Sequence, residues 1–264
     1  MVGGITFGQY VPGNSPVHRL DPRSKIICVV AAATAVLLSA GWQAFALSIG
    51  FTLFAVCLTG VSPGVLFAGL RSFRVLLAVT VVIQVFLTPG EAVAALGPLR
   101  ISLEGLEAGL YIFLRLTFLI VLASLLTLTT SPMNLTAGLE NMLSPLGRIG
   151  APVHELALMM TIAMRFVPTL LQEAQIVIKA QQSRGAAFTA GSPAGWAKSM
   201  LPLFVPLFSG ALRRAEELAV AMEARCYRGG ANRTRMKALR FCMIDYAAVA
   251  ATSAVLAAVI LLER

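Results

Sequence analysis

Residues 106–130, LEAGLYIFLRLTFLIVLASLLTLTT, set the fold class of this chain. Beyond its first turn this apolar run contains a single charged residue, Arg115, and it exceeds the roughly 20 residues that a helix needs to cross the hydrocarbon core of a bilayer. Comparable runs, some of them shorter, occupy residues 25–41, 43–61, 72–88 and 241–262. Because lipid offers no hydrogen bonds to the backbone, spans of this kind are helical. We predict an all-α integral membrane protein with about five transmembrane helices.

Composition supports a membrane protein and argues against several other classes. Of 264 residues, 58% are hydrophobic and 12% are charged, whereas soluble domains carry about 25% charged residues. The N-terminal residues 1–25 are polar and interrupted by Pro and Gly, so they lack the apolar core of a cleavable signal peptide, and we expect the N-terminus to be retained. Four cysteines without a CxxC pair and two distant histidines predict neither a metal site nor a cofactor.

The distribution of Lys and Arg predicts the orientation in the membrane. Three lie in residues 1–25, two in 62–74 and thirteen in 131–240, whereas the opposite connections carry only Arg100 and the terminal Arg264. Positively charged connections stay in the cytoplasm, so we predict an inner-membrane, multi-pass protein with a cytoplasmic N-terminus and a cytoplasmic 131–240 segment. Five spans would put the C-terminus outside. Topology also explains the net charge of +9, and no nucleic acid is implied.

These patterns predict three parts in the chain. Residues 1–130 form an N-terminal membrane bundle of about four spans, residues 131–240 a cytoplasmic or interfacial domain of long amphipathic helices, and residues 241–264 a C-terminal transmembrane helix. The segment 89–105, PGEAVAALGPLRISLEG, is too short to span the membrane and too apolar for an ordinary loop. We expect a re-entrant or interfacial turn there.

Amphipathic patterns with capping signals begin after residue 130. Ser131 and Pro132 end the preceding run, Asn134 is a candidate N-cap, and the short helix that follows ends at Ser144 and Pro145.

The next predicted helix covers about residues 152–182 and has an apolar stripe and a polar far end. Arg165 near its centre is disfavoured in a span by about 2.5–3.5 kcal/mol, and Pro168 kinks an interior turn. We therefore predict that this helix runs obliquely along the interface. The later run LPLFVPLF at 201–208 has too few apolar residues to span the membrane by itself.

Two long amphipathic helices each end in an Arg followed by a small residue. The first ends at Arg184 and Gly185, and Gly185 can adopt the left-handed conformation that ends a helix. The second ends at Arg225 and Cys226, and Arg228 follows two residues later. For one such Arg the simplest interpretation is a solvated helix cap. The repetition favours a pair of docking tips, which are helix ends that present an Arg to a partner protein. A guanidinium is planar and rigid, and its N–H donors match a partner's carboxylates.

At these motifs the chain resembles a known family, the T component of energy-coupling factor transporters, which includes the Q subunit of cobalt importers. The resemblance covers nearly the whole chain and is carried by residues 8–25, 129–160, 165–171, 180–188 and 213–230. It implies that two X-Arg-Gly signatures end two coupling helices that dock onto two ATP-binding-cassette ATPases. In this sequence the signatures fall on Ser183, Arg184 and Gly185, and on Ala224, Arg225 and Cys226. Cys226 stands where Gly is expected, so either Arg225 or Arg228 makes the second contact.

The resemblance implies a non-catalytic coupling subunit of a vitamin or micronutrient importer. Motion of two ATPases would pass through the coupling helices to a separate small membrane protein that carries the substrate. The sequence agrees that the chain is not an enzyme, because it contains no GxxxxGK[ST] phosphate loop. A self-sufficient secondary transporter is the main alternative and would show repeated halves and broken helices with polar groups near mid-membrane. An intramembrane enzyme would need clustered acids, histidines or a nucleophile with its base.

Two features of the predicted spans remain to be interpreted. Arg115 is ionisable within a span, and we favour a structural role over a functional one, with Glu107 as its candidate partner. Small residues on the last span are interpreted as a helix-packing stripe, and a docking surface for the substrate-binding subunit is the weaker alternative. The stripe consists of Ala247, Ala251, Ala254 and Ala258.

Overall fold

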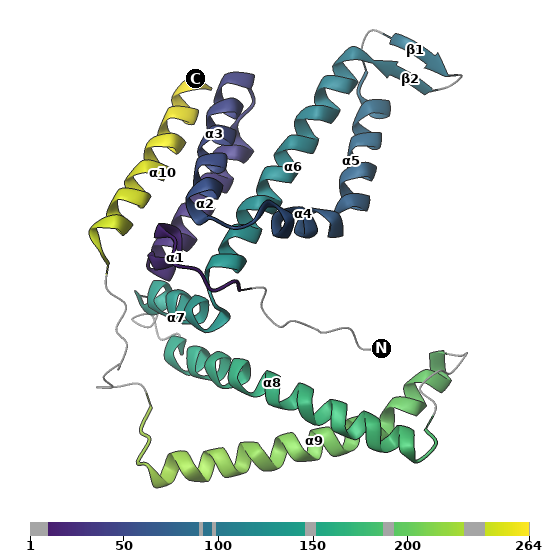
Figure 1. Ribbon diagram of the computed structural model, residues 1–264, viewed down its shortest axis with the longest axis vertical. Coiled ribbons are helices and arrows are strands. Elements are labelled where there is room, and N and C mark those ends of the chain that lie inside the picture. Colours follow the sequence, from purple (N-terminus) through teal and green to yellow (C-terminus); the bar gives the residue numbers. More distant parts are fainter. Residues whose placement is uncertain are drawn as a thin grey trace. The chain divides into compact units, whose positions relative to one another are not determined.

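The computed structural model consists of two compact units, Met1–Leu139 with Ala238–Arg264 and Glu140–Lys237, and helices dominate both (Figure 1). The structure describes residues 10–89, 92–96, 99–145, 152–186, 193–229 and 241–263.

The first unit holds most of the secondary structure of the described residues. Its elements are α1 (Pro16–Arg19), α2 (Pro22–Leu38), α3 (Trp42–Thr59), α4 (Pro63–Ser72), α5 (Arg74–Leu87), β1 (Ala92–Leu96), β2 (Leu99–Ser102), α6 (Leu103–Thr129) and α10 (Met243–Leu262). The second unit contains α8 (Val153–Ser183) and α9 (Pro193–Ala224), and the boundary between the units falls within α7 (Pro132–Leu143).

The prediction of an all-α membrane protein is confirmed, with one local exception. Four helices in the described part of the chain, α3, α6, α8 and α10, are long and apolar enough to cross a membrane, and the bent pair of α4 and α5 raises the number to five. The exception lies within 89–105, where we expected a re-entrant or interfacial turn. Instead β1 and β2 pair as antiparallel strands, with Ala95 opposite Arg100. Alternating small and branched residues in this segment suit a strand as well as a turn.

The predicted spans correspond to α2, α3, α5, α6 and α10. Two helices, α2 and α8, differ from what the sequence predicts. α2 has 17 residues and is about 26 Å long, slightly less than the hydrocarbon thickness. α8 has 31 residues and is long and apolar enough to span, although the sequence favours an interfacial course. α8 is the least apolar of the four candidate helices, so it qualifies as a possible span more by its length than by its composition.

The core of the first unit forms where α2, α3 and α6 meet. Val36 of α2 and Phe45 of α3 are fully buried, and Leu122 of α6 closes the same cluster. The Tyr111 ring packs against Phe45 with ring centroids 4.4 Å apart. On the other side of α2, Val259 near the end of α10 is buried against Ala35 of α2 and Ala44 of α3. α10 runs beside these two helices in Figure 1. These apolar contacts hold α2, α3, α6 and α10 together as one bundle.

α10 packs through a different face from the one that its alanines predict. Asp245, Thr252 and Val259 are buried, and they recur every two helical turns on one side. Ala251 and Ala254 are exposed, so the stripe of small residues is wrong as the packing face. Small residues permit close helix packing, but the buried polar and branched side chains determine which side faces the bundle.

The cap of α7 lies earlier than predicted. The Ser131 hydroxyl accepts a 3.4 Å hydrogen bond from the N–H of Asn134, and the Ser131 carbonyl accepts one of 2.9 Å from Leu135. Pro132 fits the first helical position because it has no N–H that needs a partner. Ser131 therefore caps the helix, and the assignment of the cap to Asn134 is wrong.

α9 is continuous through two prolines. The helix runs without interruption past Pro202 and Pro206, so the run at 201–208 is joined to the amphipathic segment that follows it. A proline has no N–H, so the carbonyls four residues before each one, at positions 198 and 202, receive no helical hydrogen bond. α8 likewise continues through Pro168.

Candidate functional site

The first candidate docking tip is the C-terminal end of α8. Arg184 follows the last helical residue and is exposed. Gly185 adopts a left-handed conformation with φ of +82°, and its N–H donates to the carbonyl of Gln182 over 3.0 Å. The N–H of Ala186 donates to the carbonyl of Gln181 over 3.0 Å. These two bonds form a Schellman motif, and they confirm the predicted left-handed glycine.

The end of α9 repeats this arrangement bond for bond. Arg225 follows the last helical residue, the N–H of Cys226 donates to Glu223 over 2.8 Å, and the N–H of Tyr227 donates to Met222 over 3.0 Å. Cys226 has φ of +55°, the only positive value among the non-glycine residues that the structure describes. A left-handed L-residue is disfavoured by roughly 1–2 kcal/mol. The helix therefore ends as α8 does, although the residue in the glycine position carries a side chain.

This equivalence pairs Arg184 with Arg225. Each is the first residue past its helix and directly precedes the left-handed residue. Arg228 lies beyond that reversal of the chain, so it has no counterpart in the α8 ending. Arg184 and Arg225 are both exposed, and neither guanidinium makes an ion pair within the described residues. The sequence leaves the choice between Arg225 and Arg228 open, and the backbone geometry favours Arg225.

The two helices that carry these tips are joined to each other. Arg214 of α9 forms a 2.9 Å ion pair with Glu173 of α8, and both side chains are partly buried. Among the described residues, this is the ion pair that joins the two helices. Beside it, Phe166 packs in an apolar groove shared by the two helices. The ion pair and the apolar contacts hold the two helices together.

A long apolar surface remains uncovered on α8 and α9. Large side chains that a soluble protein would bury are more than a third exposed along both helices. Isolated exposed apolar residues are ordinary, but a continuous series on two packed helices marks an interaction surface. The series includes Leu156, Met159, Met160 and Ile176 on α8, and Leu201, Phe204, Phe208, Leu212 and Val220 on α9.

Arg165 and Pro168 lie on α8 away from the two tips. Both residues are exposed, and the structure gives Arg165 no ion pair within its described residues. Exposure suits a charged residue at the water-facing side of an interfacial helix better than one inside a bundle.

Arg115 belongs to a separate polar cluster in the first unit. Its guanidinium donates to the carbonyl of Ser39 and, over 3.3 Å, to the hydroxyl of Tyr111, and it lies 4.8 Å from the centroid of the Tyr111 ring. The predicted pairing with Glu107 is wrong, because that carboxylate accepts a 2.6 Å hydrogen bond from the Trp42 indole N–H. Residues 107 and 115 are two turns apart on α6, and a group from outside α6 binds each of them: the Trp42 indole binds Glu107, and the carbonyl of Ser39 binds Arg115.

The side-chain carboxylate of Glu263, just past the end of α10, caps the start of α3. It accepts hydrogen bonds of 2.7 Å from the backbone N–H groups of Ala40 and Gly41. These bonds hold the pKa of the Glu263 carboxyl below its usual range, and the positive charge of Arg115 adds a smaller effect in the same direction. Arg115 thus has an acidic neighbour from another helix, and its contacts support a structural role.

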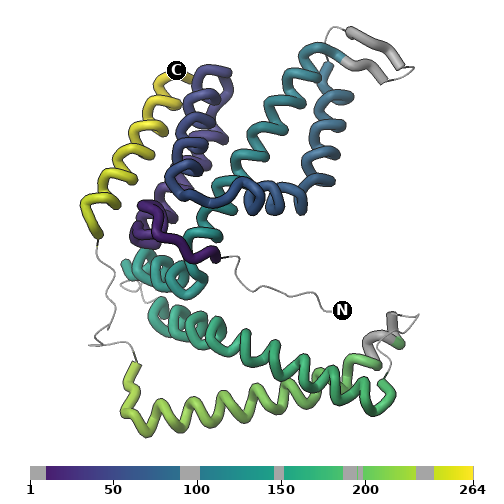
Figure 2. The backbone as a smooth tube through the Cα atoms, in the orientation of Figure 1, coloured from purple at the N-terminus to yellow at the C-terminus, as the bar shows by residue number. Residues whose placement is uncertain are grey.

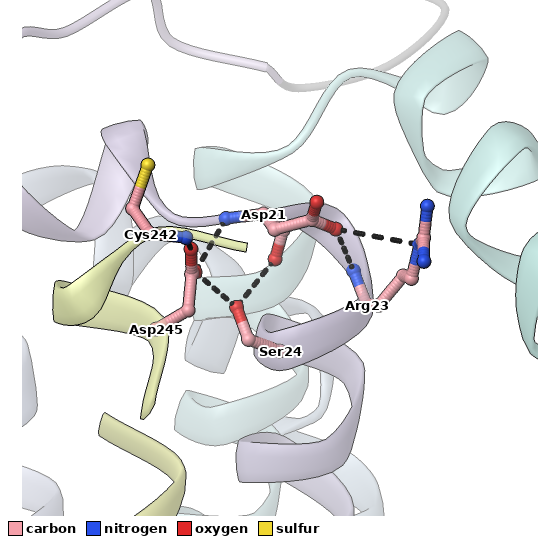
Figure 3. A network of polar contacts seen from close by, with 5 residues as sticks. All are labelled: Asp21, Arg23, Ser24, Cys242 and Asp245. Atoms are coloured by element: carbon pink, nitrogen blue, oxygen red, sulfur yellow. Dashed lines mark hydrogen bonds and ion pairs between the residues drawn. The ribbon is translucent and has the colours of Figure 1, made fainter. Parts of the chain in front are cut away.

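Asp245 is the buried polar residue that the sequence analysis missed. It is 1% exposed, and its carboxylate accepts hydrogen bonds from the N–H of Asp21 at 2.8 Å, the Ser24 hydroxyl at 2.6 Å and the N–H of Cys242 at 2.7 Å (Figure 3). The network joins the first turn of α10 to the first turn of α2. The available signal was an acid three residues after the start of an apolar run, the position that accepts a helix-capping bond.

Among the described residues, no group of three or more His, Cys, Asp or Glu side chains is arranged to hold a metal ion.

Comparison with known proteins identifies the family. The chain matches the CbiQ model, described as cobalt transport protein, over residues 13–236. It is 49% identical over 248 residues to the energy-coupling factor transporter transmembrane protein EcfT of Thermosediminibacter oceani, with 94% of each chain covered. It is 48% identical over 261 residues to EcfT of Brevibacillus brevis, with 98% of each covered, and 47% identical over 255 residues to EcfT of Heliobacterium modesticaldum, with 97% and 96% covered. The chain therefore belongs to the CbiQ and EcfT family of membrane transport proteins, the transmembrane components of energy-coupling factor transporters.

Proposed function

We propose that this chain is the coupling subunit of an energy-coupling factor importer for vitamins or related micronutrients. Two ATP-binding-cassette ATPases dock onto its cytoplasmic helices, and a separate small membrane protein binds the substrate. The observation that carries this proposal is the identical backbone ending at Arg184 and Arg225. Two equal tips suit two homologous partners, because each partner then meets the same backbone geometry and the same guanidinium.

The docking chemistry follows from the exposed arginines. A guanidinium at a rigid helix end presents parallel N–H donors that match a carboxylate, and such charge-assisted bonds are among the strongest available. Ser183, Gly185, Ala224 and Cys226 leave the approach to each Arg unobstructed by large side chains. When the ATPases move, the tips move with them, and the Glu173–Arg214 ion pair links the two helices during that motion.

The chain itself performs no catalysis in this scheme. It lacks the phosphate loop that ATP hydrolysis requires, and its role is to transmit displacement. The uncovered apolar surface of α8 and α9 suits contact with a substrate-binding membrane subunit, whose own surface is apolar. The distribution of Lys and Arg supports a cytoplasmic N-terminus and a cytoplasmic 131–240 domain between the 1–130 bundle and the 241–264 helix.

The proposal is tested by purifying the chain from native membranes in mild detergent and identifying the proteins that co-elute. Two ATP-binding-cassette ATPases and a small membrane protein are expected. Substrate uptake by the isolated chain in liposomes would instead establish the secondary transporter.

The orientation is tested separately with Lys179→Cys in a chain whose native cysteines are replaced. Residue 179 is exposed on α8. An impermeant thiol reagent should modify it in inside-out vesicles and leave it unmodified in intact cells. Modification in intact cells would reverse the proposed orientation.

A further inference from the structure

A large apolar groove with two arginines at one end lies in the first unit, whereas both docking tips belong to the second. It has a volume of about 1100 Å³ and is lined by α4, α5 and α6. Its walls are aliphatic and aromatic side chains such as Val82 and Leu110, and its charged residues are Arg71 and Arg74. No carboxylate is among the described residues that line it. An apolar groove that ends in unopposed positive charge has the two properties of a binding site for an anionic amphiphile.

The packing of the helices creates this groove. α5 and α6 touch at one end, where a Cβ on Gly105 would lie 2.7 Å from the carbonyl oxygen of Val85, and one on Gly109 would lie 2.9 Å from a methyl group of the same residue. At the other end α4 is bent by 64° from α5 and passes next to α6 (Figure 2). The groove therefore starts near this close contact and runs along α5 toward the corner between α4 and α5.

The two arginines flank that corner. Arg71 lies in the last turn of α4 and Arg74 is the first residue of α5, with Phe73 between them. Both arginines are exposed, and neither makes an ion pair within the described residues. Phe73 offers no side-chain acceptor to the first turn of α5, whose positive dipole end disfavours a nearby Arg. A bound anion would offset the helix dipole and both guanidinium charges together.

One residue of the groove wall is polar. Thr117 of α6 lines the groove, and its hydroxyl is buried and has no hydrogen-bond partner within the described residues. Other threonines in apolar helices, such as Thr80 and Thr252, donate to the carbonyl four residues earlier. α5 and α6 are antiparallel neighbours with Gly109 beside Val85, so Thr117, two turns further along α6, lies toward the arginine end of the groove.

We propose that this groove binds one anionic phospholipid of the cytoplasmic leaflet. The phosphate lies between Arg71 and Arg74, and an acyl chain lies along α5 and α6. The choice of leaflet rests on the orientation proposed above. α5 has 14 residues and is about 21 Å long, which exceeds the roughly 15 Å of hydrocarbon in one leaflet. Anionic lipids enrich that leaflet, and arginines bind phosphate through paired N–H donors.

The test uses the purified full-length chain in detergent and native mass spectrometry. Phosphatidylglycerol and phosphatidylcholine with the same acyl chains are titrated separately. The parent chain should bind one phosphatidylglycerol in preference to phosphatidylcholine. Arg71→Gln with Arg74→Gln should weaken phosphatidylglycerol binding about thirtyfold, because each basic residue contributes about fivefold to the binding of an anionic lipid, and should weaken the binding of zwitterionic phosphatidylcholine much less. Equal binding of both lipids by the parent would overturn the proposal.

A matched control separates a site from general charge attraction. Lys179→Gln with Arg213→Gln removes the same charge from exposed positions on α8 and α9 and should leave phosphatidylglycerol binding at the parental level. An equal loss in both double variants would show attraction to net charge only and overturn the site. Neither result depends on the ATPases or on orientation, so failure here is distinct from failure of the proposed function.

A filling variant tests the groove if the arginine variant does not fold. Val82 is 52% exposed on α5, so Val82→Trp can fill the groove while both arginines remain. Phosphatidylglycerol binding should fall at least tenfold. Unchanged binding would overturn the role of the groove. A photo-crosslinker at Leu110 in native membranes should label lipid, and labelling of another polypeptide in its place would assign the groove to a protein partner.

Discussion

Asp245 accepts a 2.6 Å hydrogen bond from the hydroxyl of Ser24, which joins the last helix of the chain to the second. The same carboxylate accepts the N–H of Asp21, so one buried acid satisfies two donors at the start of α2. Asp245→Ala would leave the N–H groups of Asp21 and Cys242 without this acceptor, at about 1–3 kcal/mol each, whereas the Ser24 hydroxyl keeps the carbonyl of Asp21 as its acceptor. We expect a loss of about 3 kcal/mol and a clearly lower Tm in detergent. Ser253→Ala, at an exposed position on the same helix, is the control and should change stability by less than about 0.5 kcal/mol. Equal Tm values for the two variants would contradict the role of Asp245.

The two docking tips should respond alike to charge reversal. Arg184→Glu and Arg225→Glu place a like charge against a partner's carboxylates, and each should abolish ATPase recruitment; truncation to Ala should cost about 2–5 kcal/mol of docking if the pairs are buried. Arg228→Glu should have a smaller effect, because Arg228 lies past the helix ending. Recruitment of the ATPases and substrate uptake at matched expression are the measurements. Parental recruitment by both tip variants would refute docking, and failure of Arg228→Glu alone would move the second contact to Arg228.

Cys226 provides a test of the second helix ending that does not depend on a partner. Its φ of +55° is unfavourable for a side chain, so Cys226→Gly should stabilise the end of α9 by about 0.5–1 kcal/mol after the greater freedom of Gly in the unfolded state is counted. Gly185→Ala should destabilise the end of α8 by about 1 kcal/mol for the converse reason. Amide hydrogen exchange at residues 222–227 and 181–186 measures both effects. Faster exchange in Cys226→Gly would contradict the equivalence of the two endings.

Arg115 should affect stability more than Glu107 does. Arg115→Ala removes one of two donors to the partly buried carbonyl of Ser39, the Tyr111 hydroxyl being the other, and we expect a loss of about 1–1.5 kcal/mol. Glu107→Gln retains an acceptor for the Trp42 indole and should stay within about 0.5 kcal/mol of the parent. Thermal unfolding in detergent compares the two variants. A large loss in Glu107→Gln that disappears when Arg115 is also replaced would restore the direct pairing of these residues.

The close approach of α5 and α6 depends on glycine. A methyl group at position 105 would lie 2.7 Å from a backbone carbonyl oxygen, so Gly105→Ala should destabilise the protein by about 1–3 kcal/mol. Gly50→Ala is the matched control, because nothing lies within 4 Å of its added methyl group and helix propensity favours Ala there by about 0.5–1 kcal/mol. The two substitutions should therefore shift Tm in opposite directions. A rise in Tm for Gly105→Ala would mean that the helices are further apart.

The sequence predicted the features that depend on local pattern. Apolar length identified the helices of the bundle, and Gly185 identified the end of α8, because one residue type accounts for a left-handed turn. The missed features depend on neighbours that are distant in sequence. Asp245 contacts residues near position 21, and Arg115 contacts Ser39, so no spacing within one helix could indicate either contact. The alanine stripe of α10 failed for the same reason, since its packing face is determined by residues of α2.

The course of α9 through two prolines makes this helix mechanically uneven. The carbonyls at positions 198 and 202 lack a backbone donor, so this part of the helix has two fewer hydrogen bonds to resist bending. Beyond Pro206 the helix continues for 18 residues to Ala224, about 27 Å of regular structure that resists bending. α9 is thus a stiff lever with a compliant joint near one end and Arg225 at the other. We expect a displacement of Arg225 to move this segment together with α8, to which Arg214 joins it, and to bend α9 at the prolines.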